Sequence, residues 1–186
     1  VTILVNGAAA LDPTATILDL DPADWRRTLD VTLTGAYLVS RAVLPGMIAA
    51  GGGTIVHVAS QMGHVGAPGR AAYCAAKGAL IPLAKVLALV HAADGVRVNS
   101  LSPGAIETGR LTHRFGPMDQ ARAAAVPRPP IGRPGQPEEI AAAALFPVSH
   151  RPGFMTGAGL LVDGGPPAPR PLPLPRRAPR HPARRA

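Results

Sequence analysis

Residues 54–58 read TIVHV, residues 71–92 read AAYCAAKGALIPLAKVLALVHA, and residues 96–101 read VRVNSL. The first and third segments are short runs rich in β-branched residues, which favours β-strands. The middle segment is rich in alanine and leucine and predicts a long helix, despite Pro82. A strand, a helix and a second strand in this order predict a right-handed crossover between parallel strands.

The flanking sequence extends this alternation of strands and helices in both directions. Val1–Val5 is an apolar run without polar alternation, as in a strand covered on both faces, and Leu160–Val162 reads as a last short strand. Asp21-Pro22 places an N-cap before a proline at the first helical position, so a long helix is expected over about residues 21–48, with some irregularity near Gly35.

The start of a further helix is predicted at Pro137, which is followed by two acidic residues. The segment between residues 103 and 137 is rich in proline and glycine and is typical of a long functional loop with short helical pieces. We therefore expect the α/β class: the C-terminal part of a Rossmann-like, doubly wound parallel sheet.

The basic character of the chain is concentrated at its C-terminal end. The formal net charge is +8, and residues 166–186 hold six arginines and eight prolines without an acidic residue, which leaves residues 1–165 at +2. Such a composition lacks the apolar periodicity that offsets the entropy of ordering. We expect a partial Rossmann-like domain over residues 1–165 and a disordered Pro/Arg-rich tail over residues 166–186. The charge then belongs to the tail and does not favour nucleic-acid binding by the domain.

Composition argues against several other classes of protein. Aromatic residues make up 3% of the chain, too few for a stacking surface on single-stranded nucleic acid. The single cysteine excludes an intramolecular disulfide, and the six histidines show no ligand spacing, so no metal site is expected. We see no apolar run of the roughly 20 residues that span a bilayer and no basic-then-apolar signal, so we expect a cytoplasmic protein without a membrane segment.

Ser60, Tyr73 and Lys77 form the most informative set of polar residues. Tyr73 follows Ser60 by thirteen residues, and Lys77 follows Tyr73 by four, near the start of the long helix. Residues four apart share one helix face, and a nearby ammonium favours phenolate and lowers the tyrosine pKa from about 10. A tyrosine in this setting can exchange a proton with a substrate oxygen, which a serine hydroxyl can hydrogen-bond. The set indicates carbonyl reduction or alcohol oxidation, whereas the Tyr/Lys pair alone is also typical of an ordinary amphipathic helix face.

Several motifs, in order along the chain, resemble the short-chain dehydrogenase/reductase family of the classical type. They are IVHVAS at 55–60, AYCAAKGA at 72–79, RVNSLSPG at 97–104, GRPGQPEEI at 132–140, TG at 156–157 and VDGG at 162–165. The resemblance spans nearly all of residues 1–165. It implies an oxidoreductase that uses NAD or NADP and transfers a hydride between nicotinamide and a small-molecule secondary alcohol or ketone, the 3-oxoacyl thioester type included.

The resemblance also implies a role for each matching residue. Tyr73 is implied as the acid/base, Lys77 as the residue that lowers its pKa and hydrogen-bonds the nicotinamide ribose, and Ser60 as the residue that positions the substrate oxygen. The implied cofactor-binding set also includes Asn6, Pro103, Gly104, Ile106 and Thr108. The two long helices resemble those of the family's dimer interface, which implies a homodimer or homotetramer for an intact form.

Two substitutions depart from the family pattern. The family's Asn-Asn-Ala-Gly motif reads NGAA at 6–9, so Gly7 replaces a hydrogen-bonding side chain. Thr32, in VTLTG at 31–35, stands where the family has a catalytic asparagine and lacks the paired donor and acceptor of a carboxamide. A proton relay from Lys77 through Thr32 is therefore the weakest part of the resemblance, while the chemistry closest to the substrate is retained.

The family's glycine-rich turn, which holds the pyrophosphate at a helix N-terminus, has no counterpart in this sequence. Gly51-Gly52-Gly53 precedes a strand and does not link a strand to a helix. We therefore expect a fragment, or the product of a truncated gene, that lacks the N-terminal nucleotide-binding portion. The alternative is a non-catalytic remnant or pseudoenzyme subunit that pairs with intact relatives.

Weaker candidates lie near these motifs. The resemblance places His64 in a loop that borders the substrate pocket, although an ordinary loop histidine is the simpler interpretation. Cys74, beside Tyr73, is most simply a packing thiol. The four N-terminal aspartates are most simply loop and helix-start acids: Asp12, Asp19, Asp21 and Asp24.

Overall fold

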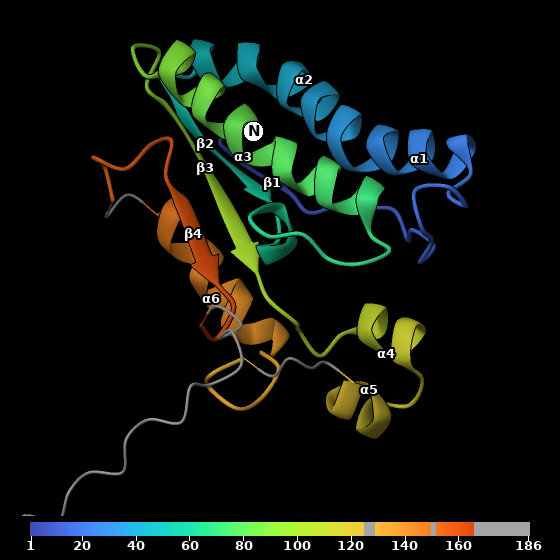
Figure 1. The fold of residues 1–186 in the computed structure, drawn as a ribbon. Coiled ribbons are helices and arrows are strands. Elements are labelled where there is room, and N and C mark those ends of the chain that lie inside the picture. The colour runs from blue at the N-terminus through green and yellow to red at the C-terminus, as the bar shows by residue number, and fades with distance from the viewer. Residues whose placement is uncertain (125–128, 150–151, 166–186) are drawn as a thin grey trace, which may run out of the picture.

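A computed structural model describes residues 1–124, 129–149 and 152–165. Its centre is one sheet of four parallel strands in the order β1-β2-β3-β4 (Figure 1). The strands are β1 (Ile3–Asn6), β2 (Gly53–Val58), β3 (Val96–Pro103) and β4 (Gly159–Val162). The expected α/β class and parallel sheet are confirmed. The tail expected at residues 166–186 lies outside the described residues.

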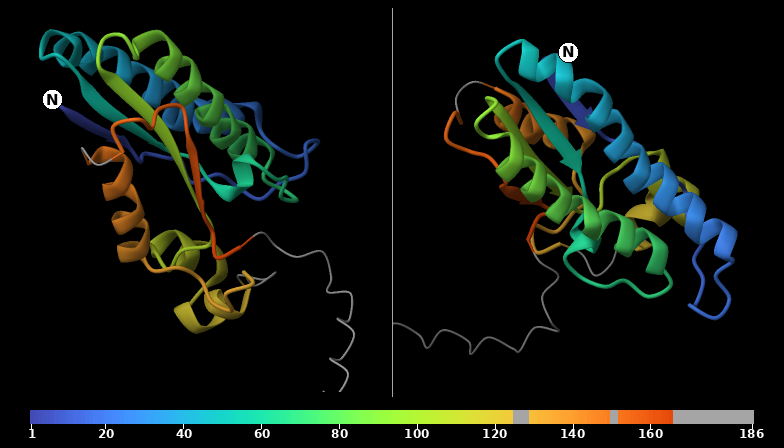
Figure 2. Two further views of the ribbon diagram at one scale, coloured as in Figure 1. Left: turned by 90° about the vertical axis from the view of Figure 1, so that its left-hand side faces the viewer. Right: turned by 90° about the horizontal axis from the view of Figure 1, so that it is seen from above.

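Helices cover both faces of the sheet, which makes the fold Rossmann-like and doubly wound (Figure 2). On one face lie α1 (Pro22–Leu29), α2 (Gly35–Ala49) and α3 (Ala71–His91), and on the other lies α6 (Pro137–Val148). A π-helical turn, η1 (Asp30–Thr34), joins α1 to α2 immediately before Gly35, where the sequence predicted an irregularity.

The main core lies between the sheet and helices α2 and α3. Its buried residues include Met47 on α2, Ile55 on β2, Ala84 on α3 and Val98 on β3. Successive side chains of a strand point to opposite faces, and Arg97 accordingly donates to the carbonyl oxygens of Pro147 and Ser149 at the end of α6. The central strands β2 and β3 are therefore covered on both faces.

Strand β1 is covered on one face only within the described residues, which corrects the expectation drawn from its unbroken apolar run. Leu4 packs against the core, whereas Ile3 and Val5 are 50% and 47% exposed. The difference follows from the position of β1 at the edge of the sheet, where it pairs with β2 alone and no described helix lies over its second face.

Two helical segments, Pro22–Ala49 and Ala71–His91, are long and apolar enough to span a membrane by length and composition alone. These segments are not uninterrupted apolar runs, since they contain charged residues such as Lys77 and Lys85, so the expectation from the sequence is not contradicted. Core helices of soluble proteins meet the same criterion, and both segments here pack against the sheet.

The carboxyl ends of β2 and β3 lead into the segments that carry most of the candidate site residues. Strand β2 runs into a short 3₁₀ turn, η2 (Gln61–Gly63), and β3 runs into the long segment up to Pro137. That segment contains α4 (Gly109–Phe115) and α5 (Met118–Ala124), which lie beyond the carboxyl end of β3 (Figure 1). The predicted long loop with short helical pieces is confirmed.

Candidate active site

Tyr73 and Lys77 lie on the first two turns of α3, on one face of the helix. The Lys77 ammonium nitrogen is 5.9 Å from the centroid of the Tyr73 ring. Lys77 is 3% exposed and donates a hydrogen bond to the carbonyl oxygen of Val58 at the end of β2. The i,i+4 spacing thus brings the two side chains together, and β2 fixes the ammonium of Lys77 next to the ring.

The environment of Lys77 penalises its positive charge. Burial is the larger cause and the nearby charge of Arg110 is the second, and together they lower the pKa of Lys77 from 10.5 to about 8. The side chain is therefore mainly charged at neutral pH, but it loses its proton far more readily than an exposed lysine.

Ser60 lies two residues after the end of β2 and is 7% exposed. Its Oγ accepts a hydrogen bond of 3.1 Å from the backbone N–H of Met62 and so caps the η2 turn, while its own O–H proton stays available for a further acceptor. The turn lies against α3, because a Cβ atom on Gly63 would come within 2.9 Å of the backbone carbon and oxygen of Lys77. Ser60 and Lys77 are thus held by the same close contact between backbones.

The structure places Asn6 and Thr32 in contacts that join β1 and its following loop to the helical layer. The side-chain amide of Asn6 donates to the Ser40 hydroxyl at 3.1 Å and lies 3.1 Å from Nδ1 of His57. Thr32 is 1% exposed in the π-helical turn, and its Oγ1 accepts from the backbone N–H of Ala10 at 3.3 Å. In the described residues the hydrogen bond from the Lys77 side chain goes to Val58, and none joins it to Thr32.

His57 is a fully buried residue of β2 that the sequence motifs did not single out. Burial is the main cause, and the charge of Lys77 the second, of a pKa lowered from 6.5 to about 4. The imidazole is therefore neutral at physiological pH, and Asn6 is its neighbour at Nδ1. Within the described residues Nε2 is buried without a hydrogen-bond partner.

The expected cofactor segment begins where β3 ends, beside the carboxyl end of β2. Pro103 closes β3, and Gly104 packs so tightly on the chain after β4 that a Cβ atom would lie 2.7 Å from the Cα of Asp163. Ile106 forms a β-bridge with Gly135, and Thr108 precedes α4 as its N-cap with an exposed side chain. These residues thus lie along the edge of the sheet where Ser60 and Lys77 are held.

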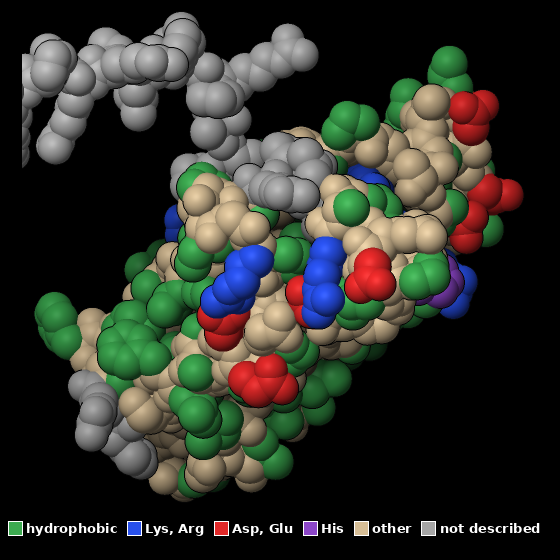
Figure 3. Space-filling model, turned by 90° about the horizontal axis from the view of Figure 1, so that it is seen from below, with side chains coloured by type: hydrophobic (Ala, Val, Ile, Leu, Met, Phe, Trp, Pro, Cys, Tyr) green, Lys and Arg blue, Asp and Glu red, His purple; other side chains and the backbone are tan. Residues whose placement is uncertain are grey.

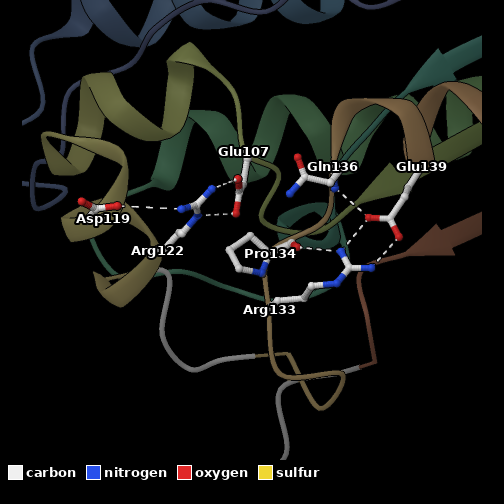
Figure 4. Close-up of polar contacts among 7 residues, drawn as sticks. All are labelled: Glu107, Asp119, Arg122, Arg133, Pro134, Gln136 and Glu139. Atoms are coloured by element: carbon white, nitrogen blue, oxygen red, sulfur yellow. Dashed lines mark hydrogen bonds and ion pairs between the residues drawn. The ribbon is translucent and has the colours of Figure 1, made fainter.

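Two arginine–glutamate pairs fasten the segment after β3 (Figure 4). Arg122 of α5 donates to both carboxylate oxygens of Glu107 at 2.7 Å, and Arg133 donates to both oxygens of Glu139 at 2.7 and 2.8 Å. The hydrogen bonds from Arg122 are the main cause that lowers the pKa of Glu107 to about 2, and those from Arg133 do the same for Glu139. On this side of the molecule basic side chains lie directly beside acidic ones (Figure 3).

A group of arginines surrounds Tyr73 and was missed by the sequence motifs. The guanidinium carbons of Arg70 and Arg110 lie 4.7 and 5.3 Å from the centroid of the Tyr73 ring. Arg70 precedes α3 and forms an ion pair with Asp12, whose side chain is 2% exposed. Asp12 is therefore a buried partner and not the simple loop acid that we expected. Its pairing with Arg70 joins residues 58 positions apart, so no local pattern announces it.

His64 also reaches the end of β3. Its Nε2 lies 2.9 Å from the hydroxyl oxygen of Ser102, a buried residue that the motifs did not single out as a site residue. Cys74 is partly buried beside Tyr73. Both residues thus border the candidate site without joining the Tyr73–Lys77 contact.

A family profile described as enoyl-(acyl carrier protein) reductase matches residues 1–166. The chain belongs to the short-chain dehydrogenase/reductase family. It is 44% identical over 169 residues to 2-(S)-hydroxypropyl-CoM dehydrogenase 3 of Xanthobacter autotrophicus, covering 88% of this chain and 65% of the relative. It is 40% identical over 163 residues to cis-4-hydroxycyclohexanecarboxylate dehydrogenase of Sinomonas cyclohexanicum, covering 88% of this chain and 64% of the relative.

A solved structure of a short-chain dehydrogenase/reductase family protein superimposes with a TM-score of 0.79 at 40% identity, covering 89% of this chain and 66% of that one. The chain thus spans slightly less than two thirds of the length of the curated relatives it matches. The two relatives named above are dehydrogenases, and the short-chain dehydrogenase/reductase family uses NAD or NADP as its cofactor.

The described residues fit the nicotinamide-ribose part of such a cofactor. An ammonium has three N–H donors, and the hydrogen bond to Val58 uses one donor of Lys77, which leaves two for ribose hydroxyls next to Tyr73. Ser60 contributes a hydroxyl from the neighbouring strand end. The donor set of this short-chain dehydrogenase/reductase chain is thus suited to binding hydroxyl groups and a carbonyl oxygen.

Proposed function

We propose that the protein containing this chain interconverts a secondary alcohol and a ketone, with Tyr73 as the acid/base. The observation that carries the proposal is the contact between Tyr73 and the buried Lys77, held beside Ser60 at the carboxyl ends of the strands. NAD or NADP, when bound, accepts the hydride from the alcohol or supplies it to the ketone.

Each residue has a separate task in this proposal. The Tyr73 hydroxyl protonates the ketone oxygen in reduction, and its phenolate takes the hydroxyl proton in oxidation. The Ser60 hydroxyl hydrogen-bonds the same substrate oxygen and so holds it near Tyr73. Lys77 binds the ribose hydroxyls and stabilises negative charge at the tyrosine oxygen. The peptide segment Pro103–Thr108 is the proposed wall of the nicotinamide site.

Asn6 and Thr32 act as positioning residues in this proposal. Asn6 links the end of β1 to α2 and to His57. Thr32 holds the backbone N–H of Ala10, in the loop between Asn6 and Asp12. Both residues thus fix the loop after β1 rather than the substrate itself.

The test is a matched pair of tyrosine substitutions in the protein expressed from its complete coding sequence. Tyr73→Phe removes the acid/base and should lower turnover of secondary alcohols and 3-oxoacyl thioesters with NAD(P) by at least about 100-fold. Binding of NAD(P)H, followed by fluorescence titration, should be nearly unchanged. Tyr37→Phe alters the other tyrosine, which lies 46% exposed on α2, and should retain turnover. Equal turnover of wild type and Tyr73→Phe would overturn the assignment.

The second candidate function is a non-catalytic subunit that pairs with intact relatives. The observation in its favour is Thr32, a hydroxyl residue already engaged by Ala10 at the position of a family asparagine. This candidate predicts no turnover with any substrate of the panel and co-purification with an active oxidoreductase, whereas the first predicts turnover by the isolated protein.

We also propose that the outer faces of α2 and α3 form a homodimer or homotetramer contact. Leu38, Val86, Leu89 and Val90 are 51–82% exposed on these helices. Between the helices lies an apolar hollow of about 370 Å³, whose lining includes Leu44, Ile48 and Leu87. Exposed apolar surface of this extent favours association between subunits. The proposed location of the protein is the cytoplasm. Light scattering on the purified protein distinguishes a dimer or tetramer from a monomer.

A further inference from the structure

The arginines around Tyr73 come from two elements that meet over the ring. Arg70 lies at the start of α3, while Arg110 and Arg114 are four residues apart on α4 and so share one face of that helix. Arg110 lies over the Tyr73 ring, and its guanidinium donates to the carbonyl oxygens of Ala9 and Ala10. The face of α4 that carries Arg114 is therefore turned toward the candidate active site.

Negative charge around this group is scarce. Asp12 is the acidic side chain that the described contacts bring to it, and its carboxylate pairs with Arg70 and lies 3.8 Å from Arg110. One carboxylate therefore serves two of the guanidiniums, and the described contacts bring no second acidic side chain to Arg114 or Lys77. By contrast, Arg122 and Arg133 each have a glutamate of their own.

The excess of positive charge is reflected in the pKa values of Lys77 and Arg114. The charge of Arg110 contributes to the lowered pKa of Lys77, after burial. Burial is also the first cause of a lowered pKa of Arg114, followed by the charge of Arg70, while Asp12 and Tyr73 act in the opposite direction. Repulsion among fixed cations near a reacting group is relieved when an anion binds between them.

The guanidinium groups of the three arginines differ in how many hydrogen-bond and ion-pair partners they have within the described residues. Arg70 is 7% exposed and held by Asp12, and Arg110 is held by two backbone carbonyls. Arg114 is exposed and has no hydrogen-bond or ion-pair partner among the described residues; it contacts the ring of Phe115. Its fork of N–H donors matches the two oxygens of a carboxylate or sulfonate.

We propose that the substrate of this site is an anionic hydroxy or oxo compound, whose carboxylate or sulfonate binds Arg114 while its hydroxyl or carbonyl carbon lies at Tyr73. Arg70 and Arg110 provide the surrounding positive field. The proposal rests on the proposed oxidoreductase function and specifies the chemistry of its substrate class. Arg114 is a specificity-determining residue in this proposal, because it lies on α4, in the segment between β3 and α6, and not on α3, which carries Tyr73 and Lys77.

The first experiment measures discrimination between an acid and its neutral isostere. The pairs are 4-hydroxypentanoate and 5-hydroxyhexanoate, each against its primary amide, with 2-hydroxypropanesulfonate as the sulfonate arm. We expect kcat/KM for the acid to exceed that for the amide by roughly 10- to 100-fold, the range of a charge-assisted hydrogen-bonded contact. The ratio should fall as the ionic strength rises. A higher kcat/KM for the sulfonate than for both carboxylates identifies the sulfonate as the better ligand.

The variants assign that discrimination to a residue. Arg114→Gln should bring the acid/amide ratio close to one, whereas Arg26→Gln, on the exposed surface of α1, should leave it unchanged. A KM for NAD(P) that rises in Arg114→Gln, with the acid/amide ratio unaltered, would assign the arginines to the cofactor phosphates and overturn the proposal.

A binding measurement separates this proposal from the oxidoreductase function. Calorimetric titration of the purified protein with 5-hydroxyhexanoate requires no turnover, and Arg114→Gln should weaken this binding roughly 10-fold or more. Turnover of a neutral alcohol that depends on Tyr73, without any preference for acids, would reject the anionic substrate and retain the enzyme. Absence of turnover together with Arg114-dependent binding of the acid would reject the enzyme and retain the anion site.

Discussion

The candidate site is built from two regions that are held together in different ways. On one side, Ser60 and Lys77 are fixed by backbone contacts between β2, the η2 turn and α3, and both residues are buried. On the other, the segment after β3 is fastened by the pairs Arg122–Glu107 and Arg133–Glu139, whose arginines are about half exposed (Figure 4). The first region holds the proposed reacting groups in buried positions, and the second lies on the surface, where residues can change without disturbing those positions. Changes in the α3 region should therefore abolish function, whereas changes in the loop region should tune it.

The largest effect in this comparison is expected at Gly63. Alanine there places a Cβ atom 2.9 Å from the backbone carbon and oxygen of Lys77, and backbone atoms within a helix cannot move aside independently. Overpacking of this kind costs about 1–3 kcal/mol in the free energy of unfolding. Gly63→Ala should therefore lower both the melting temperature and kcat.

The matched control lies in the same loop. Gly66→Ala adds the same atom where no atom of the described residues lies within 4 Å, and should change neither quantity. If Gly63→Ala and Gly66→Ala melted alike and turned over alike, the backbone contact between η2 and α3 would have no part in holding the site.

An intermediate effect is expected at Arg110, where the two regions meet. The Arg110 charge is the second cause of the lowered pKa of Lys77, after burial. Arg110→Met should therefore raise the pKa of Lys77 from about 8 part of the way toward 10.5, and move the basic limb of the kcat profile to higher pH. Lys85→Met, on the exposed side of α3, should leave that limb in place. An unmoved limb in Arg110→Met would show that the loop does not act on Lys77.

The lowered pKa of Lys77 also makes the stability of the folded protein depend on pH. Because the pKa of Lys77 is lower in the folded state than the 10.5 of an exposed lysine, the unfolded chain binds more protons between about pH 8 and 10.5. The cost of burying the charged lysine is present in full below about pH 8 and is relieved as pH rises through this window. In Arg110→Met that relief should begin at a higher pH.

The strands and long helices followed from local patterns in the sequence. The β-branched runs marked β2 and β3, and the Asp21-Pro22 signal marked the start of α1, where the Asp21 side chain accepts from the N–H of Ala23. The spacing of Tyr73 and Lys77 placed both on one helix face, since a helix repeats every 3.6 residues whatever surrounds it.

The charge environment of the site did not follow from such patterns. Asp12 and Arg70 pair across 58 residues, and Arg110 reaches Ala9 across 101. Contacts between residues so far apart in the sequence depend on how the helices and strands pack, and no local spacing of residues encodes them. Nε2 of His57, which has no hydrogen-bond partner among the described residues, is a further case, because its burial follows from the position of β2 between its neighbours and not from the residues beside it.

The smallest effect is expected from the ion pair on the loop side. Glu107→Gln keeps the shape of the side chain and removes the charge that Arg122 holds with two hydrogen bonds. Exposed pairs contribute little to stability, so the melting temperature at pH 7 should fall far less than in Gly63→Ala, and KM should rise by less than about five-fold at unchanged kcat.

The pKa of Glu107 is lowered to about 2, so the stabilisation that the pair provides is complete above pH 4.5 and is lost as pH falls through about 2. The difference in melting temperature between wild type and Glu107→Gln should therefore narrow between pH 4.5 and 2. A fall in kcat as large as in Gly63→Ala would mean that the loop, and not α3, holds the reacting groups.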